Sequence, residues 1–278
     1  MEWLDALLLG ILQGLAEYLP ISSSGHLEIA HDLLNLNTSG ADSLQFDVVL
    51  HVATVLSTIV VLWHEFSHLC TSFFTFKNDA NTRLVWKILV SCIPVMFVGV
   101  FLKDEVEKLF GGNLIVVGTC LCITALLLAF AYFTRTRPIW TSRSSVVGAN
   151  VGRDINFLDA FVIGCAQAVA VLPGLSRSGS TIATGILLGN KRDKLASFSF
   201  LMVIIPVLGA AVLDIYDSLT GKKAIGEVGL VPCVVGFLAS FIVGCLACKW
   251  MINIVKKGGL IWFALYCIIV GLICLFVG

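Results

Sequence analysis

The sequence predicts an all-α integral membrane protein with six transmembrane helices and two re-entrant helical hairpins in an inverted repeat. Of 278 residues, 58% are hydrophobic and 13% are charged, and the mean hydropathy is +0.97. Soluble domains carry about 25% charged residues, so this composition excludes a water-soluble globular protein. The formal net charge is zero, which by itself says nothing about partners. We expect no nucleic-acid partner.

Six apolar runs are long enough to cross a bilayer, which takes roughly 17 to 25 helical residues. Tryptophans stand near the ends of several runs, as interfacial aromatic residues should. We therefore predict six transmembrane helices, at Phe46 to Trp63, Leu84 to Leu102, Leu114 to Phe133, Leu195 to Leu213, Val228 to Trp250 and Leu260 to Val277.

Two further regions join an apolar stretch to a polar Pro/Ser/Gly cluster and a short second limb. The apolar stretches are Trp3 to Leu19 and Phe157 to Leu172, and the second limbs are His26 to Leu36 and Ser180 to Gly189. The second limbs are too short to span a bilayer. Irregular backbone at membrane depth must be buried in protein or line a wet cavity, so each region is predicted to be a re-entrant hairpin.

The two hairpin regions also resemble each other. Leu4, Asp5, Ala6, Gly10, Gln13 and Gly25 recur, at an offset of 154 residues, as Leu158, Asp159, Ala160, Gly164, Gln167 and Gly179. With three crossings after each hairpin, the second copy must be inverted in the membrane. We predict one membrane domain: a first repeat over residues 1–133, a cytoplasmic linker over 134–156 and an inverted second repeat over 157–278.

The distribution of Lys and Arg predicts the orientation. On this topology thirteen of the 18 fall on one face, four on the other, and Arg177 on neither. Cytoplasmic loops carry the excess of Lys and Arg. The richer face is therefore predicted to be cytoplasmic, with both termini outside.

The first hairpin carries Gln13 and Glu17, four residues apart on one helix face, so both side chains can point to one spot. A carboxylate at this depth is costly unless it is paired or bound to a cation. An intramembrane ionisable residue usually marks a functional site, and a helix-packing hydrogen bond is the alternative.

The serine-rich cluster Ser22-Ser23-Ser24-Gly25-His26 opens the second limb of the first hairpin. Hydroxyls and free N–H groups at a helix N-terminus form an anion site, and glycine permits close approach. His26 could act as an acid or base, or could activate a neighbouring hydroxyl. We predict that this cluster and Gln13 bind substrate, and simple helix capping is an equal alternative for the serine motif alone.

The second hairpin repeats this design and adds an arginine. A guanidinium fits phosphate oxygens, although an Arg near mid-bilayer costs roughly 2.5 to 3.5 kcal/mol on insertion scales. A structural ion pair between Arg177 and Glu17 is the alternative. The clusters predict a site for a phosphate or diphosphate carried by a lipid, with these ligands from the second hairpin: Gly174, Ser176, Arg177, Ser178, Gly179 and Thr181.

The segment His64 to His68 fits the HExxH pattern of zinc proteases. It lies at the end of a predicted crossing, beside Trp63, and no third ligand is evident nearby. We interpret the two histidines as interfacial residues. His31 and His51 are interpreted as polar residues of the interior.

Two stretches, QGLAEYLPISSSGHL and LPGLSRSGSTIATG, resemble the signature motifs of the undecaprenyl-diphosphate phosphatase family, whose members are linked to bacitracin resistance. The resemblance implies hydrolysis of undecaprenyl diphosphate to undecaprenyl phosphate and inorganic phosphate, which recycles the lipid carrier for cell-wall synthesis. It also implies a multi-pass protein of the bacterial inner membrane whose active site faces the outer side. A transporter or flippase of the polyprenyl phosphate carrier is the alternative, since broken helices at the midplane are transporter architecture.

The resemblance also assigns roles by motif position. Glu17 resembles the family's acid, Ser23 and His26 its SSxGH residues, and Arg177 its phosphate-binding arginine; all four are predicted to be catalytic. His26 is expected to deprotonate Ser23 or a water. A divalent cation, Mg²⁺ or Ca²⁺, is implied, and we expect Glu17 to hold it with the carbonyl of Gln13, which stands where the family has Glu or Gln. The expected partners are a polyprenyl diphosphate and membrane lipids, and a homodimer stays open.

Overall fold

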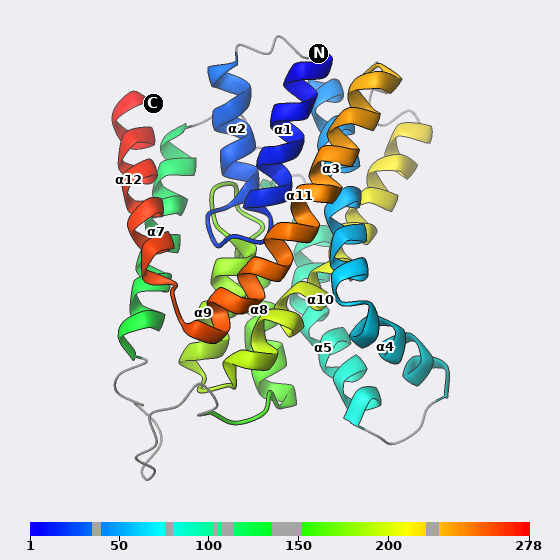
Figure 1. Cartoon of the computed structure of the whole chain (residues 1–278), viewed down its shortest axis with the longest axis vertical. Coiled ribbons are helices and arrows are strands. Elements are labelled where there is room, and N and C mark those ends of the chain that lie inside the picture. The colour runs from blue at the N-terminus through cyan, green and yellow to red at the C-terminus, as the bar shows by residue number, and fades with distance from the viewer. Residues whose placement is uncertain (35–39, 76–79, 103–104, 107–113, 135–151, 221–227) are drawn as a thin grey trace.

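The computed structural model describes residues 1–34, 40–75, 80–102, 105–106, 114–134, 152–220 and 228–278. Over these residues the fold is all-helical apart from one isolated bridge between Arg153 and Asn190 (Figure 1). The helices are α1 (Trp3–Ala16), α2 (Ser23–Leu33), α3 (Gly40–Val61), α4 (Trp63–Thr75), α5 (Ala80–Phe101), α7 (Leu114–Thr134), α8 (Phe157–Val169), α9 (Arg177–Leu187), α10 (Arg192–Leu219), α11 (Leu230–Lys257) and α12 (Ile261–Val277).

Within the described part of the chain, four helices are long and apolar enough to cross a membrane: α5, α7, α10 and α11. Helices α3 and α4 together make a fifth candidate, bent by 90° at the break between Val61 and Trp63, where Leu62 lies. The last predicted crossing corresponds to α12, which is apolar but only 17 residues long. The prediction of an all-α protein with several membrane-spanning helices is confirmed.

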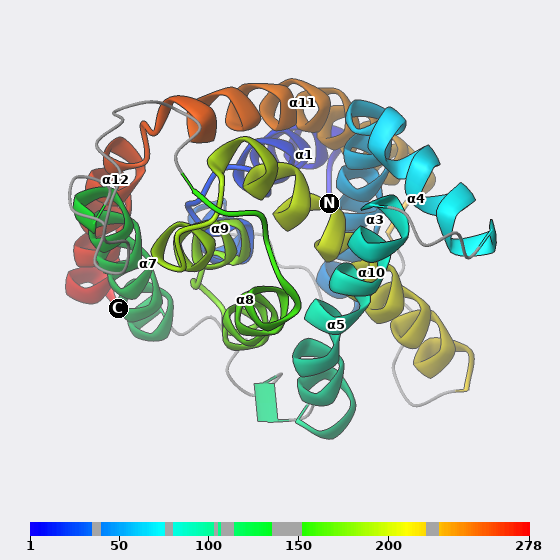
Figure 2. The same cartoon turned by 90° about the horizontal axis from the view of Figure 1, so that it is seen from below.

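The two predicted hairpins are the helix pairs α1–α2 and α8–α9, and their turns touch. In Figure 1, α1 and α2 lie in the upper half of the molecule and α8 and α9 in the lower half, with the connecting turns near mid-height. Ser178 Oγ donates to the Leu19 carbonyl at 3.2 Å. Seen from below, α9 lies at the centre, beside α8 and surrounded by the longer helices (Figure 2). The polar clusters of the two hairpins therefore share one interior position.

Two glycines matched by the repeat, Gly10 and Gly164, let the first limbs pack closely against long helices. A Cβ on Gly10 would lie 2.5 Å from the Gly236 carbonyl oxygen in α11, and one on Gly164 would lie 2.2 Å from the Ser91 carbonyl oxygen in α5. Real Cβ atoms do not approach backbone that closely. Helix α1 thus packs on α11, and α8 on α5, so each hairpin packs against the other half of the chain.

Gly164→Ala is expected to destabilise the protein by about 1–3 kcal/mol, because the added methyl group overpacks a contact between two backbones. The thermal unfolding midpoint in detergent measures this effect. Gly99→Ala in α5 is the matched control, since nothing lies within 4 Å of a Cβ there and Ala favours a helix by up to about 1 kcal/mol over Gly. Equal midpoints for Gly164→Ala and the wild type would contradict the close packing of α8 on α5.

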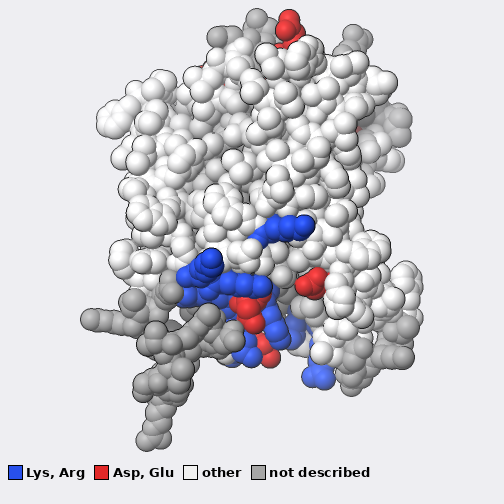
Figure 3. All heavy atoms as spheres, viewed as in Figure 1, with Lys and Arg blue, Asp and Glu red and all other residues white. Residues whose placement is uncertain are grey.

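Lys and Arg gather at the end of the molecule away from the two chain termini (Figures 1 and 3). The rest of the face shown in Figure 3 is almost free of charge, apart from acidic atoms at the opposite end. Among the described residues, Lys and Arg therefore lie mainly at one end of the molecule, whereas the four Lys predicted for the other face, Lys103, Lys108, Lys222 and Lys223, lie outside the described residues.

At this charged end, ion pairs tie the beginning of α8 to the segment after α9. Buried Asp159 accepts two hydrogen bonds of 2.6 Å from Arg153 and one of 2.9 Å from Asn190 Nδ2. Hydrogen bonds from Lys191 and Lys194 lower the pKa of the exposed Asp154 carboxyl. These contacts hold the base of the second hairpin. Of the predicted linker over 134–156, residues 135–151 lie outside the described part.

Candidate functional site

The carboxylate of Glu17, directly after α1, joins the two hairpins. Its Oε2 accepts hydrogen bonds from Ser23 Oγ at 2.6 Å and from Gln13 Nε2 at 3.0 Å. Its Oε1 accepts from Arg177 Nη2 at 3.1 Å, across 160 residues of sequence. The structure thus brings Gln13, Glu17, Ser23 and Arg177 into one cluster.

A tight turn after Glu17 aims Ser23 at this carboxylate. Helix α1 ends at Ala16, and the next helix begins at Ser23 with Ser22 as its N-cap, whose Oγ accepts the Gly25 N–H at 3.3 Å. Ser22 has φ 72°, the one positive φ of a non-glycine residue in the described chain. Such a conformation costs on the order of 1–3 kcal/mol and is typical of functional sites. Ser24 extends the cluster, with its Oγ 3.4 Å from Ser22 Oγ.

The second hairpin presents Arg177 as the first residue of α9. Ser176 is the N-cap, and its Oγ accepts the Gly179 N–H at 3.0 Å. Thr181 Oγ1 donates to the Arg177 carbonyl at 2.9 Å, and Ser178 is bound to the opposite turn through Leu19. These predicted ligands therefore hold the turn that positions the guanidinium.

Glycines allow the two turns to meet. Gly174 has φ 85°, and a Cβ there would also lie 2.6 Å from the Val117 carbonyl oxygen. A Cβ on Gly25 would lie 2.9 Å from the Gly174 Cα, and one on Gly179 would lie 3.2 Å from Pro20 Cβ. Side chains at these positions would push the hairpins apart and separate Glu17 from Arg177.

The buried ring of His26 is engaged away from Ser23. Its Nδ1 lies 2.8 Å from the Ser22 carbonyl oxygen, and its Nε2 lies 2.8 Å from the Tyr266 hydroxyl. The expected approach of His26 to the Ser23 hydroxyl is therefore not the arrangement in the structure, where Glu17 accepts that hydroxyl. The His26 ring is instead turned toward Tyr266 of α12. This helix lies outside the sequence motif that contains His26 and Ser23.

The histidines of the HExxH segment lie on the exposed surface of α4, with their Nε2 atoms 3.3 Å apart. Within the described ranges, no group of three or more His, Cys, Asp and Glu side chains is arranged to hold a metal ion. The segment is also remote in sequence from both hairpins.

A family model described as "Bacitracin resistance protein BacA" matches residues 6–273. The chain belongs to the BacA family. It is 52% identical to the undecaprenyl-diphosphatase of Bacteroides fragilis strain ATCC 25285, covering all of this chain and 98% of that protein. It is 53% identical to the undecaprenyl-diphosphatase of Parabacteroides distasonis over 98% of this chain and 97% of the relative, and 35% identical to that of Methanosphaera stadtmanae over the same shares. The family resemblance predicted from two short motifs is confirmed over nearly the whole chain.

The site of this BacA-family chain also includes residues outside the two motifs. His51 Nε2 lies 3.8 Å from Glu17 Oε2, and its Nδ1 lies 2.7 Å from the Asp47 carbonyl oxygen. From the sequence we interpreted His51 only as a polar residue of the interior. A signal was present, because His51, Thr54 and Thr58 recur at helical spacing along one face of an otherwise apolar crossing.

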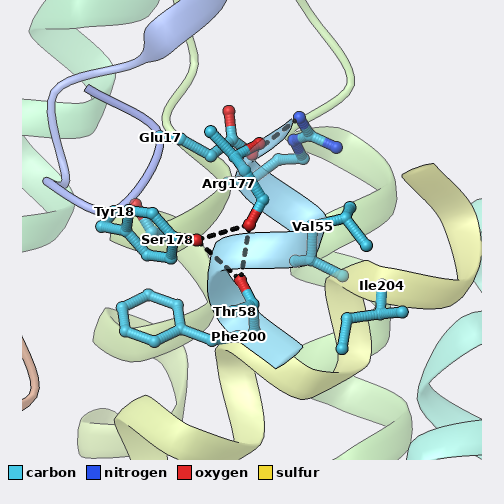
Figure 4. A pocket seen from close by; sticks show the side chains of 10 residues that line it. Glu17, Tyr18, Val55, Thr58, Arg177, Ser178, Phe200 and Ile204 are labelled. Atoms are coloured by element: carbon cyan, nitrogen blue, oxygen red, sulfur yellow. Dashed lines mark hydrogen bonds and ion pairs between the residues drawn. The ribbon is translucent and has the colours of Figure 1, made fainter. Parts of the chain in front are cut away.

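Tyr18 links the Glu17 turn to this polar face of α3. Its hydroxyl is 2.6 Å from the Thr54 carbonyl oxygen and 2.8 Å from Thr58 Oγ1, and it also contacts Ser57 Oγ. Figure 4 shows Tyr18 and Thr58 beside the Glu17–Arg177 pair, with Phe200 and Ile204 of α10 completing a small pocket. The pocket volume is about 20 Å³, enough for about one water molecule.

Proposed function

We propose that this chain hydrolyses undecaprenyl diphosphate to undecaprenyl phosphate and inorganic phosphate. Membership of the BacA family and the similarity to undecaprenyl-diphosphatases support this activity. Within the site, the observation that carries the proposal is the Ser23 hydroxyl hydrogen-bonded to Glu17, whose other oxygen is bound by Arg177. The reaction would recycle the lipid carrier for cell-wall synthesis and would confer resistance to bacitracin.

In this mechanism Ser23 is the nucleophile and Glu17 its base. Glu17 Oε2 takes the hydroxyl proton while Oγ bonds to the terminal phosphorus and the bridging P–O bond breaks, which releases undecaprenyl phosphate. Water then cleaves the phosphoseryl bond and releases phosphate. Direct attack by a water that Glu17 or His26 deprotonates is the other route that these residues allow.

Arg177 binds the diphosphate in this proposal. A guanidinium has five N–H donors, and the contact with Glu17 uses Nη2, so further donors can reach phosphate oxygens. The first N–H groups of α2 and α9 have no partner within their helices and favour the same anion. Together these donors would stabilise the charge that develops at phosphorus. Ser22 and Ser176, as N-caps, would hold these helix ends in position.

Glu17 and Gln13 are the residues that we propose to hold a divalent cation, Mg²⁺ or Ca²⁺. They fit this role because the Gln13 side chain is fully buried and its Oε1 has no hydrogen-bond partner among the described residues. Carboxylate and amide oxygens are the ligands that these hard cations prefer. When bound, the cation would neutralise part of the diphosphate charge.

Phosphate release from undecaprenyl diphosphate by the purified protein in detergent tests this function. We expect release with Mg²⁺ or Ca²⁺ and its loss with EDTA, restored by excess cation. Transport between leaflets cannot produce phosphate in detergent, so release separates hydrolysis from transport of the carrier. A folded protein that releases no phosphate would contradict the proposal, and release that is unaffected by EDTA would contradict the cation site alone.

We also propose that the chain crosses the inner membrane six times, with hairpins that enter from opposite faces and a site open to the outer side. The inverted repeats over 1–133 and 157–278 and the cytoplasmic linker belong to this proposal. The contact between the two turns and the clustering of Lys and Arg at one end support it.

A reporter fused after Gly278 tests this orientation. We expect an alkaline phosphatase reporter, which is active only outside the cytoplasm, to be active there, and a fluorescent protein that matures only in the cytoplasm to be dark. The matched control is a fusion after Lys257, at the end of α11, where the two results should be reversed. The opposite pattern at both positions would contradict the predicted orientation.

A further inference from the structure

Tyr266, in the last helix, contacts the first hairpin at His26. The Tyr266 hydroxyl is 2.8 Å from His26 Nε2, across 240 residues of sequence. The two rings are stacked, with centroids 5.6 Å apart and an angle of 16° between their planes. His26 is only 7% exposed, whereas Tyr266 is 42% exposed, so the contact runs from the surface of α12 into the site.

The contacts of His26 determine which ring nitrogen carries the proton. The partner of Nδ1 is the Ser22 carbonyl oxygen, which can only accept, so Nδ1 must donate. In the neutral ring Nε2 is then the acceptor, and the Tyr266 hydroxyl donates to it. The one basic lone pair of His26 is therefore used by Tyr266 and is not directed at Ser23.

His26 in turn holds the strained turn before Ser23. The Ser22 carbonyl accepts from His26 twice, from the ring Nδ1 at 2.8 Å and from the backbone N–H at 3.2 Å. Ser22 is the residue with φ 72°, a conformation that persists only where surrounding contacts enforce it. Ser23 follows directly, and its hydroxyl reaches Glu17 at 2.6 Å.

A second contact from the same helix supports the same turn. Cys267 Sγ lies 3.5 Å from the Pro20 carbonyl oxygen and is fully buried. Neighbouring residues of α12 therefore hold both sides of the segment from Pro20 to Ser22. Cys267 Sγ is directed at a carbonyl of this turn, and the Tyr266 hydroxyl is directed at the His26 ring that contacts the next carbonyl but one, that of Ser22.

We propose that Tyr266 is a positioning residue for Ser23, which acts through His26 and the Ser22 turn. The hydroxyl of Tyr266 fixes the His26 ring, the ring fixes the Ser22 carbonyl, and that turn aims Ser23 Oγ at Glu17. This inference rests on the proposed phosphatase activity, and it assigns His26 a supporting role in place of acid–base chemistry. The last helix thereby completes a site that is otherwise built by the two hairpins.

Tyr266→Phe tests the proposal, because it keeps the stacked ring and removes only the hydroxyl. We expect kcat for phosphate release to fall about 10- to 100-fold, since a misplacement of about 1 Å can have an effect of that size, while KM changes less than about twofold. Tyr216→Phe, at an exposed tyrosine of α10, is the matched control and should keep wild-type kcat. An unchanged kcat in Tyr266→Phe, or a change confined to KM, would overturn the proposal.

Nitrogen-15 NMR of histidine-labelled protein gives a second readout that needs no turnover. The His26 signals are assigned by their loss in His26→Gln. We expect the wild type to hold the tautomer with the proton on Nδ1, and Tyr266→Phe to give a mixture of tautomers. An unchanged His26 spectrum would overturn the proposal even if kcat fell. Absence of phosphate release by the wild type would instead contradict the proposed function, and the spectra would still test the contact itself.

Discussion

Replacement of Glu17 by Gln is expected to lower kcat for phosphate release by about 10²- to 10⁴-fold, the range typical of a lost general base. The amide keeps the size of the side chain but cannot take the Ser23 proton. It also removes the negative charge that Arg177 faces at 3.1 Å. Steady-state phosphate release in detergent measures the effect.

Glu65→Gln is the matched control for this variant. Glu65 is an exposed carboxylate of α4, so its replacement should leave the rate within about twofold of the wild type. Thermal unfolding midpoints show whether both variants are folded. A Glu17→Gln enzyme that kept near-normal turnover would remove Glu17 from the role of base.

Arg177→Ala should lower kcat by about 10²- to 10³-fold, as does the loss of one donor to a developing oxyanion, and should also raise KM. The Arg177 guanidinium is the one cationic side chain bound to Glu17 by a hydrogen bond in the described chain. Both kcat and KM should change because the bound substrate and the transition state both carry phosphate charge. Arg177→Lys keeps the charge but loses the planar fork, so its rate should fall between those of the wild type and Arg177→Ala.

Arg83→Ala, at an exposed position of α5, controls for the loss of a positive charge at the surface. Part of any instability of Arg177→Ala would come from leaving Glu17 without its ion pair, so kcat is compared only among variants with similar unfolding midpoints. Retention of wild-type kcat and KM by folded Arg177→Ala would show that the arginine does not bind the diphosphate.

The sequence predicted those features that depend on local pattern. The composition predicted the membrane class, and the broken apolar stretches predicted limbs close to the observed α2 and α9. The sequence also identified Glu17, Ser23 and Arg177 as candidate site residues. An ionised side chain or a hydroxyl cluster in an apolar sequence needs an ionic or hydrogen-bonding partner. The contact between Glu17 and Arg177 was considered only as a structural alternative, and the hydrogen bond from Ser23 to Glu17 was not predicted.

Features that depend on distant packing were not predictable in this way. His26 was paired with Ser23 because they are close in sequence, but the ring turns toward Tyr266, 240 residues away. The 90° bend between α3 and α4 is not evident from an apolar run that ends at Trp63. His51 carried a helical-spacing signal, yet its proximity to Glu17 depends on how α3 packs beside the first turn.

Diphosphate hydrolysis at Ser23 is tested most directly by comparing phosphate release from undecaprenyl diphosphate by purified wild-type protein and by Ser23→Ala under identical conditions in detergent. We expect release by the wild type and a loss of at least about 10²-fold in Ser23→Ala, because the nucleophile is absent. Equal rates for the two folded proteins would contradict chemistry at Ser23, and no release by either would contradict the phosphatase itself.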